Sequence, residues 1–329
     1  MRWRDRISQL VFAASAGLVI LLMASIIIFI GSNAYQTFTV DHVNPLRFFF
    51  SSVWAPDSGQ VGALVLITGT ITVTVLSTLL STPISVGIAL FITEVAPPWA
   101  RQFMQPVIEL LAGIPSIVYG FLGLVIIVPL VAKTYNYFAG GYFNTGFGVI
   151  AATLVLTVMI LPTIGSIAID TLAALPNGLR EASMALGATR WQTIRRTLLP
   201  AASSGIFTGV VLGLGRAVGE TLAVSFVIGS NVNSFPFRIS NFYPYFNLTP
   251  TSTITVQLLF DFAEAPPGSL NLHAIWTLAF VLLMISFGLV VLSRWIASRN
   301  AFNVTSDKPR KRWLRSGLAP TRLYLRRAS

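Results

Sequence analysis

The sequence has no cysteine, only two histidines and three lysines, and just 10% of its 329 residues are charged. Without cysteine, neither a disulfide framework nor a thiolate metal site can form. The histidines, His42 and His273, lie near the ends of apolar runs, where a lone histidine is more often a hydrogen-bonded interfacial residue than a ligand. No lysine follows a glycine, so the chain lacks the P-loop of an ATPase. We therefore predict that the chain is not an enzyme and holds no metal or cofactor.

Apolar residues dominate instead, at 54% of the chain, which is the composition of a polytopic membrane protein. A membrane-crossing helix needs about 20 apolar residues. The first apolar run, from Leu10 to Ile30, exceeds the 7–15 residues of a signal-peptide core and predicts a retained helix. The sequence thus predicts an all-α fold with six transmembrane helices, at 8–31, 63–92, 107–132, 147–169, 203–230 and 273–296.

The distribution of Lys and Arg predicts the orientation of these helices. If the N-terminus is cytoplasmic, the segments on that side hold eighteen Lys and Arg, and the outer loops hold three. Cytoplasmic loops carry the excess of basic residues. Both termini and the segment 179–200 are therefore expected in the cytoplasm.

The net charge of +11 lies mostly in the C-terminal tail, which is basic from Arg294 onward and contains one acidic residue, Asp307. The tail shows neither zinc-finger spacing nor an aromatic-rich basic groove, so no nucleic-acid partner is predicted. Polybasic segments beside a membrane helix bind anionic lipids. We expect residues 301–329 to be a mobile, basic cytoplasmic tail with membrane lipids as its partner.

The outer segments differ from the tail. Residues 1–62 are predicted to form a first helix followed by an ordered external loop, and residues 63–300 to form the membrane core. Within the long outer segment 231–272, the apolar stretch 254–262 is too short to span. A re-entrant or outer-surface helix is expected there. The aromatic residues of these loops could form an interfacial belt or contact a partner protein.

Two charged residues lie inside the fifth apolar segment. Arg216 is near its middle, and Glu220 follows four residues later on the same helical face. Placing arginine at a bilayer centre costs roughly 2.5–3.5 kcal/mol on insertion scales, so such residues face a water-filled path or a partner charge. A guanidinium binds a phosphate-like oxyanion through two parallel hydrogen bonds. Glu220 could hold Arg216 when the substrate is absent, or select the protonation state of the anion. Alternatively, the two form an ion pair that only locks helices.

A second unusual site is the sequence GIPSIVYGFLGL at 113–124, where Pro115 interrupts a helix directly after Gly113. The interruption frees backbone groups that need protein or water partners. Glu109 precedes it by one to two helical turns. The sequence alone leaves a packing kink and a role in the substrate path equally open.

The segment 179–200, LREASMALGATRWQTIRRTLLP, is polar and helix-prone between two apolar spans. Ala182, Ala185 and Leu186 give it a small apolar face at helical spacing. Gly187 allows the backbone to turn, and Pro200 suits the start of the next helix. We predict a helical hairpin that meets another protein. An ordinary basic cytoplasmic loop is the alternative.

Three runs of residues together resemble the permeases of the phosphate-specific (Pst) ABC importer: AGIPSIVYGFLGL, LREASMALGATRWQTIRRTLLPAA and GLGRAVGETLAVSFVIGS. The second run is similar to the EAA signature of ABC-importer permeases, and RAVGETLAV is closer to the PstC type than to the PstA type. The resemblance covers roughly residues 60–297. The signature departs at Ser183, in place of its second alanine, and at Thr197, in place of an aliphatic residue.

This resemblance implies the MetI-like permease fold, a location in the bacterial inner membrane and the import of inorganic phosphate into the cytoplasm. It implies a second homologous permease, two ATP-binding subunits and an extracytoplasmic phosphate-binding protein as partners. Arg216 and Glu220 would lie on the substrate path. The residues implied in coupling to the ATPase are Glu181, Ala182, Gly187, Arg190 and Pro200.

Other classes of transport remain to be considered. An ABC permease for another oxyanion, molybdate or sulfate, would share the chemistry of Arg216. A secondary transporter driven by an ion gradient would need an intramembrane carboxylate relay and inverted repeats, but only Glu220 is clearly deep and no repeat is evident. A membrane scaffold or sensor would explain the basic tail but not Arg216.

Overall fold

The computed structural model describes residues 2–138, 145–235 and 250–305, and the side chains of residues 8–137, 145–235 and 250–295. The elements, in chain order, are α1 (Arg2–Thr39), α2 (Pro45–Phe50), β1 (Trp54–Ala55), η1 (Pro56–Ser58), β2 (Gln60–Val61), α3 (Leu64–Leu90), η2 (Phe91–Val95), α4 (Pro98–Ala112), α5 (Ser116–Leu122), η3 (Gly123–Ile127), α6 (Val128–Phe138), α7 (Val149–Ala173), α8 (Asn177–Ala185), α9 (Arg190–Thr193), η4 (Ile194–Leu198), α10 (Leu199–Gly219), α11 (Leu222–Ser225), α12 (Ile254–Glu264) and α13 (Leu270–Thr305).

The described residues contain six helices long and apolar enough to cross a membrane, as the sequence predicts: 8–39, 64–95, 116–137, 149–173, 190–219 and 270–295. The helix ends differ by more than two turns from the predicted spans in the first, third and fifth helices, and the first helix continues to Thr39. The third span begins at Ser116, because residues 98–112 form the separate helix α4. The helix that contains the fifth span runs from Arg190 to Gly219, because α9, which is an arm of the hairpin, continues into η4 and α10 without a break.

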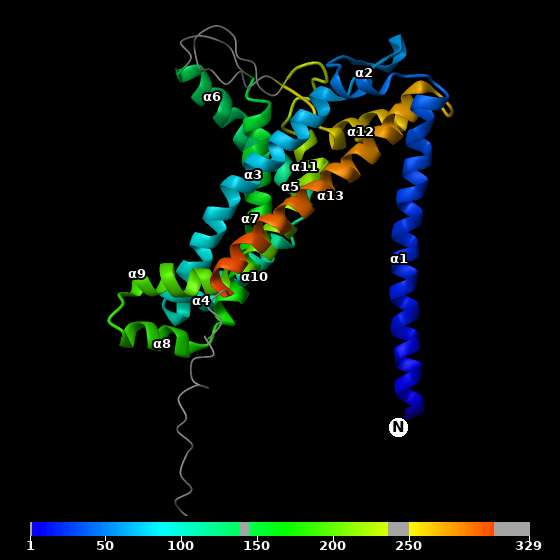
Figure 1. The fold of residues 1–329 in the computed structure, drawn as a ribbon. Coiled ribbons are helices and arrows are strands. Elements are labelled where there is room, and N and C mark those ends of the chain that lie inside the picture. Colours follow the sequence, from blue (N-terminus) through cyan, green and yellow to red (C-terminus); the bar gives the residue numbers. More distant parts are fainter. Residues whose placement is uncertain (1, 139–144, 236–249, 306–329) are drawn as a thin grey trace, which may run out of the picture.

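Helix α7 is the centre of the bundle and packs against α3, α10 and α4 (Figure 1). Its contact with α3 is lined by small hydroxyl side chains, which allow membrane helices to approach closely. Ser85 donates a hydrogen bond to the carbonyl of Leu161 on α7 at 2.9 Å. The buried hydroxyl residues of α3 recur along one face, at Thr70, Thr74, Ser77, Thr78, Ser81 and Ser85.

Glycine at position 69 permits a further close approach of α3. A Cβ atom there would collide with the backbone carbonyl of Ser252, next to the hydrogen bond from the amide of Ile254 to Thr70. We expect Gly69→Ala to destabilise the protein by about 1–3 kcal/mol, as overpacking does, and to lower the unfolding midpoint in detergent. Gly87→Ala, on the same helix but facing open space, is the control. Equal midpoints for the two variants would contradict this close contact.

The α8–α9 segment and the N-terminal end of α1 lie at one end of the molecule, which we call the hairpin end (Figure 1). Helices α2 and α12 and the hairpin of β1 and β2 lie at the opposite end. The indole nitrogen of Trp54 and the amide of Gln257 both donate to the carboxylate of Asp261 on α12, at 2.9 and 2.7 Å. The short helix predicted at 254–262 is confirmed as α12, whereas part of the long segment before it, 236–249, lies outside the described residues.

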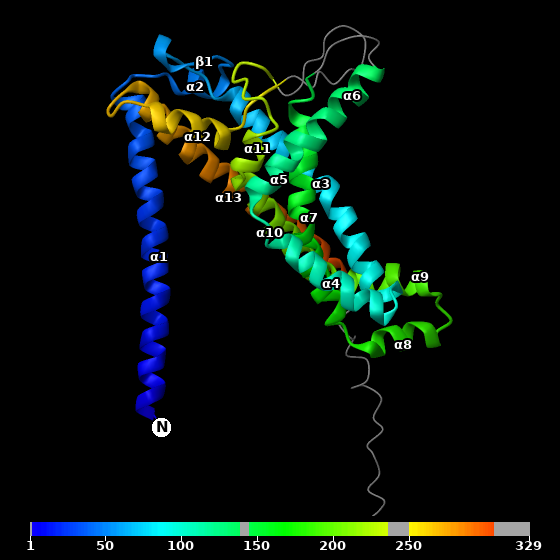
Figure 2. The same ribbon diagram turned by 180° about the vertical axis from the view of Figure 1, so that it is seen from behind.

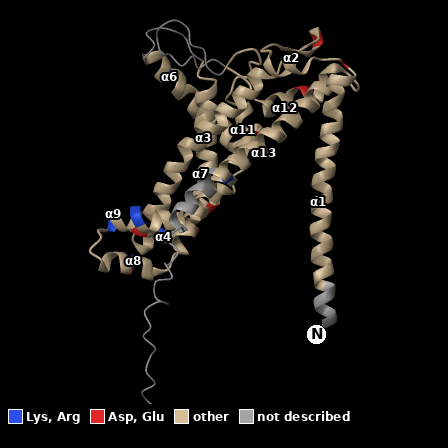
Figure 3. Cartoon of the chain, in the orientation of Figure 1, with Lys and Arg blue, Asp and Glu red and all other residues tan. Residues whose placement is uncertain are grey.

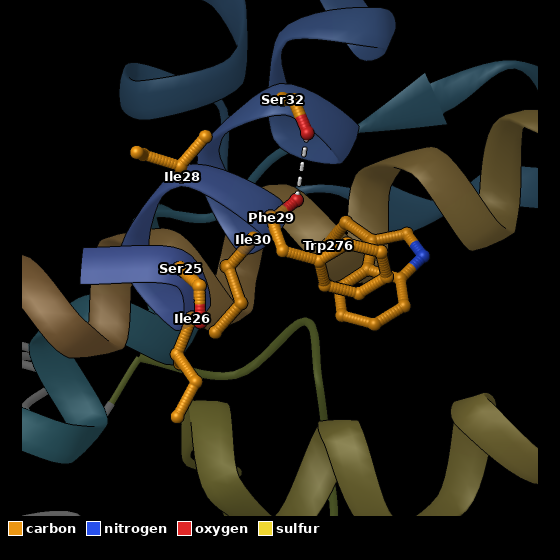
Figure 4. Close-up of a pocket in the computed structure, with 7 residues that line it drawn as sticks. All are labelled: Ser25, Ile26, Ile28, Phe29, Ile30, Ser32 and Trp276. Carbon is orange, nitrogen blue, oxygen red and sulfur yellow. Dashed lines mark hydrogen bonds between the residues drawn. The ribbon is translucent and has the colours of Figure 1, made fainter. Parts of the chain in front are cut away.

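Helix α1 stands apart from the bundle and meets α13 only near the opposite end, as Figure 2 also shows. Thr37 and Thr277 share a hydrogen bond of 2.7 Å, and His273 Nδ1 lies 2.8 Å from the carboxylate of Asp41. His273 is thus hydrogen-bonded, as expected. Beside these contacts, residues of α1 and Trp276 of α13 line an open apolar groove of about 780 Å³, in which Phe29 packs edge-on against the indole ring (Figure 4).

Candidate substrate pathway and coupling hairpin

Arg216 lies in the last turn of α10, half-buried among three helices. Its guanidinium donates to the hydroxyl of Thr163 on α7 at 3.0 Å and, more weakly, to the carbonyl of Ala112 at the end of α4 at 3.5 Å. Helix C-termini carry partial negative charge. The C-terminal ends of α10 and α4 therefore both stabilise this cation inside the bundle.

Glu220 does not pair with Arg216, and the expectation that the two lie on the same helical face is wrong. Helix α10 ends at Gly219, and Glu220 is extended, with φ −74° and ψ 122°. Its carboxylate accepts from the amide of Ala223 at 3.0 Å, and its carbonyl accepts from Thr255 at 3.0 Å. No ion pair joins it to Arg216 in the described part of the chain. The glycines at 213, 215 and 219 weaken the helix, and the carboxylate satisfies an amide that the break leaves free.

This break also moves Arg216 away from the middle of a continuous span, because the fifth helix stops one turn after it. A pocket of about 380 Å³ opens beside the break and is lined partly by Gly219, Thr221 and Thr255. Arg216 does not line this pocket, whose other walls are apolar residues of α12 and α13.

The chain is also broken at Gly113–Pro115, where α4 ends and α5 begins. The hydroxyl of Tyr119 donates to the carbonyl of Leu111 at 2.7 Å, while Arg216 reaches the carbonyl of Ala112. Two side chains therefore donate to carbonyls at the end of α4, and the carbonyl of Leu111 also accepts a long hydrogen bond of 3.3 Å from the amide of Ile114. Glu109 is exposed and is not part of this arrangement; it accepts a weak hydrogen bond of 3.4 Å from Gln105.

Tyr119 and Thr163 are site residues that the sequence did not single out. A hydroxyl one helical turn beyond the proline break was the only signal for Tyr119. For Thr163 there was none, because threonine recurs throughout α7 and only tertiary packing places this one against Arg216.

The predicted hairpin is confirmed as α8, a turn and α9. Gly187 has φ +83°, a left-handed conformation that side chains rarely adopt, and a Cβ there would meet no other atom within 4 Å. Thr189 begins α9 with a capping box in which its side chain and that of Gln192 each accept a backbone hydrogen bond. Backbone conformation, and not lack of space, therefore requires glycine at the turn.

The hairpin presents both charged and apolar residues to its surroundings. Glu181, Ala182 and Arg190 are exposed, and Leu186 at the tip is 89% exposed. Met184 and Trp191 are also exposed. Pro200 is half-buried in the first turn of α10, directly after η4. Figure 3 shows Lys and Arg gathered around α9 at this end of the molecule.

The two departures from the EAA signature contact each other. Ser183 Oγ on α8 lies 3.0 Å from the hydroxyl of Thr193, and Thr197 on η4 donates to Ser183 at 3.4 Å. Three hydroxyls therefore join the two arms of the hairpin, and two of them stand where the signature has apolar side chains. The departures at Ser183 and Thr197 compensate each other, because each hydroxyl is a hydrogen-bond partner of the other.

Comparison with known proteins agrees with this geometry. Residues 81–301 match the family described as binding-protein-dependent transport system inner membrane component, and this range includes Arg216, Glu220 and the whole hairpin. A chain from the crystal structure of a bacterial ABC transporter involved in the import of the acidic polysaccharide alginate aligns with a TM-score of 0.52. Its identity is 18%, over 86% of this chain and 95% of that chain, so this likeness shows the fold alone.

Similar sequences cover nearly the whole chain. The probable ABC transporter permease protein YqgH of Bacillus subtilis (strain 168) is 42% identical over 88% of this chain and 90% of its own length. The phosphate transport system permease protein PstC of Xylella fastidiosa (strain 9a5c) is 35% identical over 90% and 91%. PstC of Haemophilus influenzae is 33% identical over 90% and 94%. The chain is a multi-pass inner-membrane permease, and it belongs to the binding-protein-dependent transport system inner membrane components, together with the PstC permease proteins.

Proposed function

We propose that this chain is a permease subunit of an ATP-driven importer that moves inorganic phosphate into the cytoplasm. The observation that carries the proposal is Arg216, a permanent cation inside the helix bundle whose described partners are a hydroxyl and a backbone carbonyl. Because no described carboxylate neutralises it, an incoming oxyanion is its natural counter-charge. The similarity to PstC proteins favours phosphate as that oxyanion.

The surroundings of Arg216 suit passage as well as binding. The broken ends of α4 and α10 bring partial negative charge close to the guanidinium. This charge weakens the hold on an anion, and a transport site has to release what it binds. Glu220, one residue beyond α10, faces the same break without neutralising Arg216. It is suited to repel an anion of the wrong charge.

Molybdate and sulfate are tetrahedral dianions that a guanidinium also binds, so the substrate needs a direct test. The complete complex, reconstituted in vesicles containing ATP on the cytoplasmic side, should accumulate radiolabelled phosphate. A large excess of sulfate or molybdate should compete weakly. Uptake of molybdate or sulfate in preference to phosphate would assign the chain to another oxyanion.

The hairpin is the proposed docking site for the ATPase, since this chain has no P-loop. Its tip carries exposed apolar side chains at Met184, Leu186 and Trp191, with charges at Glu181 and Arg190 beside them. Ala182 is also exposed, and Pro200 is in the first turn of α10. Two ATP-binding subunits would dock, one on this hairpin and one on the corresponding hairpin of a second homologous permease.

The remaining partners follow from the two ends of the molecule. With the hairpin in the cytoplasm, the N-terminus is cytoplasmic too, because it lies at the same end (Figure 1). The opposite end, with α2, the β-hairpin and α12, would then receive an extracytoplasmic phosphate-binding protein. The exposed α1 is available to the second permease. In this arrangement the first helix and its external loop are residues 1–62, and the permease core is residues 63–300. The tail, residues 301–329, lies mainly outside the described residues.

The basic tail should be dispensable for transport. Deleting residues 303–329 removes no residue of the six membrane-length helices and none of the hairpin. We expect unchanged phosphate uptake by the assembled complex, together with weaker binding to vesicles that contain anionic lipid, because polybasic segments bind such surfaces. Loss of uptake in a correctly inserted and fully assembled truncation would show that the tail takes part in transport.

A further inference from the structure

Arg180 joins three structural elements at the base of the hairpin. From α8, its guanidinium donates to both carboxylate oxygens of Glu94 in η2, with a shortest distance of 2.7 Å. It also donates to the carbonyls of Leu172 and Leu175, each at 3.1 Å. These carbonyls belong to the C-terminal end of α7 and the turn that follows. One side chain therefore connects α8, the end of α3 and the end of α7.

The contacts of Arg180 are shielded from water, and they pair its guanidinium donors with carboxylate and carbonyl acceptors. The side chains of Arg180 and Glu94 are only 20% and 11% exposed. Carbonyls at the end of a helix lack the full set of helical donors: that of Leu172 accepts a long hydrogen bond of 3.3 Å from the amide of Leu175, and the guanidinium supplies a further donor to Leu172 and to Leu175. Hydrogen bonding to Glu94 raises the pKa of Arg180, so the group stays charged. A planar fork can serve a carboxylate and two carbonyls together, which an ammonium group cannot.

Beyond this base the hairpin is itself held together. The three hydroxyls of Ser183, Thr193 and Thr197 join α8 to α9 and η4. Arg180 precedes Ser183 by one helical turn. A displacement of the hairpin tip should therefore reach the base and not be absorbed between the arms.

From the base, α7 leads directly to the candidate substrate site. The carbonyl of Leu172, which Arg180 contacts, lies nine residues after Thr163, and Thr163 holds Arg216. Both residues are on the single helix α7. Packed side chains and rigid elements of this kind are the physical means by which distant sites are coupled.

We propose that Arg180 and Glu94 are positioning residues for energy coupling, which transmit movement of the docked hairpin to α3 and α7 and hence to the Arg216 site. The inference rests on the proposed docking of the ATPase to the hairpin. It concerns neither binding of the ATPase nor binding of the anion, but the connection between them.

The test compares phosphate molecules imported per ATP hydrolysed in reconstituted complexes. The variants are Arg180→Gln, Glu94→Gln and the double substitution, with Arg101→Gln, an exposed arginine on α4, as the control. We expect the ratio to fall at least about fivefold in Arg180→Gln, at the lower end of coupling free energies between sites. Glu94→Gln should be milder, because Arg180 keeps its carbonyl partners. The double variant should be no worse than Arg180→Gln, since the two residues act through one contact.

The ratio separates transmission from stability. If the pair merely stabilised the fold, uptake and hydrolysis would fall in proportion and the ratio would stay at the parent value, which would overturn the proposal. Arg180→Lys should give an intermediate ratio, and a ratio at the parent level would show that the fork is not needed. If Arg180→Gln fails to assemble, Glu94→Gln decides the matter, because it leaves no buried carboxylate without a partner. If the parent chain does not co-purify with its ATPase, the docking proposal fails first and this inference fails with it.

Discussion

Arg216→Gln is expected to reduce phosphate uptake by roughly 10- to 100-fold for each charge-assisted hydrogen bond that the substrate loses, while the complex still assembles. Glutamine retains one donor group but no charge, so it can replace the hydrogen bond to Thr163 without attracting an oxyanion. Uptake by vesicles containing the complete complex is the measurement. Co-purification of all subunits confirms that assembly is intact.

Matched variants separate the roles at this site. Arg216→Lys keeps the charge but loses the bidentate geometry, so uptake should be impaired without being abolished. Arg101→Gln, at an exposed arginine on α4 outside the site, is the control for loss of a positive charge. Parent-like uptake by Arg216→Gln would mean that the arginine only holds α4 and α7 together.

Glu220→Gln tests the second charged residue. The amide can still accept the hydrogen bond from Ala223, so the break after α10 should persist. A leaky or less selective path would support a role in screening anions. Failure to fold would instead assign Glu220 to the architecture of the break.

Gly187→Val is expected to uncouple the permease from its ATPase. A β-branched residue held at φ +83° stores strain of about 1–3 kcal/mol. If the strain is relieved by loss of the turn, the apparent affinity for the ATPase falls by roughly 5- to 150-fold. Co-purification of the ATPase and ATP hydrolysis by the complex are the measurements. The permease should still insert, because the turn lies outside the six spans.

Two controls attribute this effect to backbone conformation. Gly178→Val places the same side chain in α8, where the glycine also faces open space but lacks a positive φ. It should therefore be much milder. Gly187→Asn should retain most of the coupling, because asparagine tolerates the left-handed region. Glu181→Lys tests the charge beside the turn and should also weaken the ATPase contact. Full coupling in both Gly187→Val and Glu181→Lys would remove the hairpin from the docking surface.

The sequence by itself determined the number of membrane-length helices, the hairpin and the short helix α12. Each depends on local properties: a run of about 20 apolar residues requires a spanning helix, and a glycine permits the left-handed turn at 187. The break at Gly113–Pro115 was also visible, because proline lacks the amide that a helix interior needs. The start of the third span was nevertheless predicted too early. Apolar residues of α4 precede the break, and they lengthen the apolar run from which the span was predicted.

Only the tertiary structure decided which groups the charged residues contact. Spacing four residues apart predicted a pair between Arg216 and Glu220, but α10 ends between them and each finds other partners. Arg180 and Glu94 are 86 residues apart, and nothing local joins them. Helices form from local hydrogen bonds and apolar length, whereas the partner of a buried charge depends on which helices pack together. The sequence therefore identifies the charges inside this permease, and the packing of α3, α4, α7 and α10 determines what they hold.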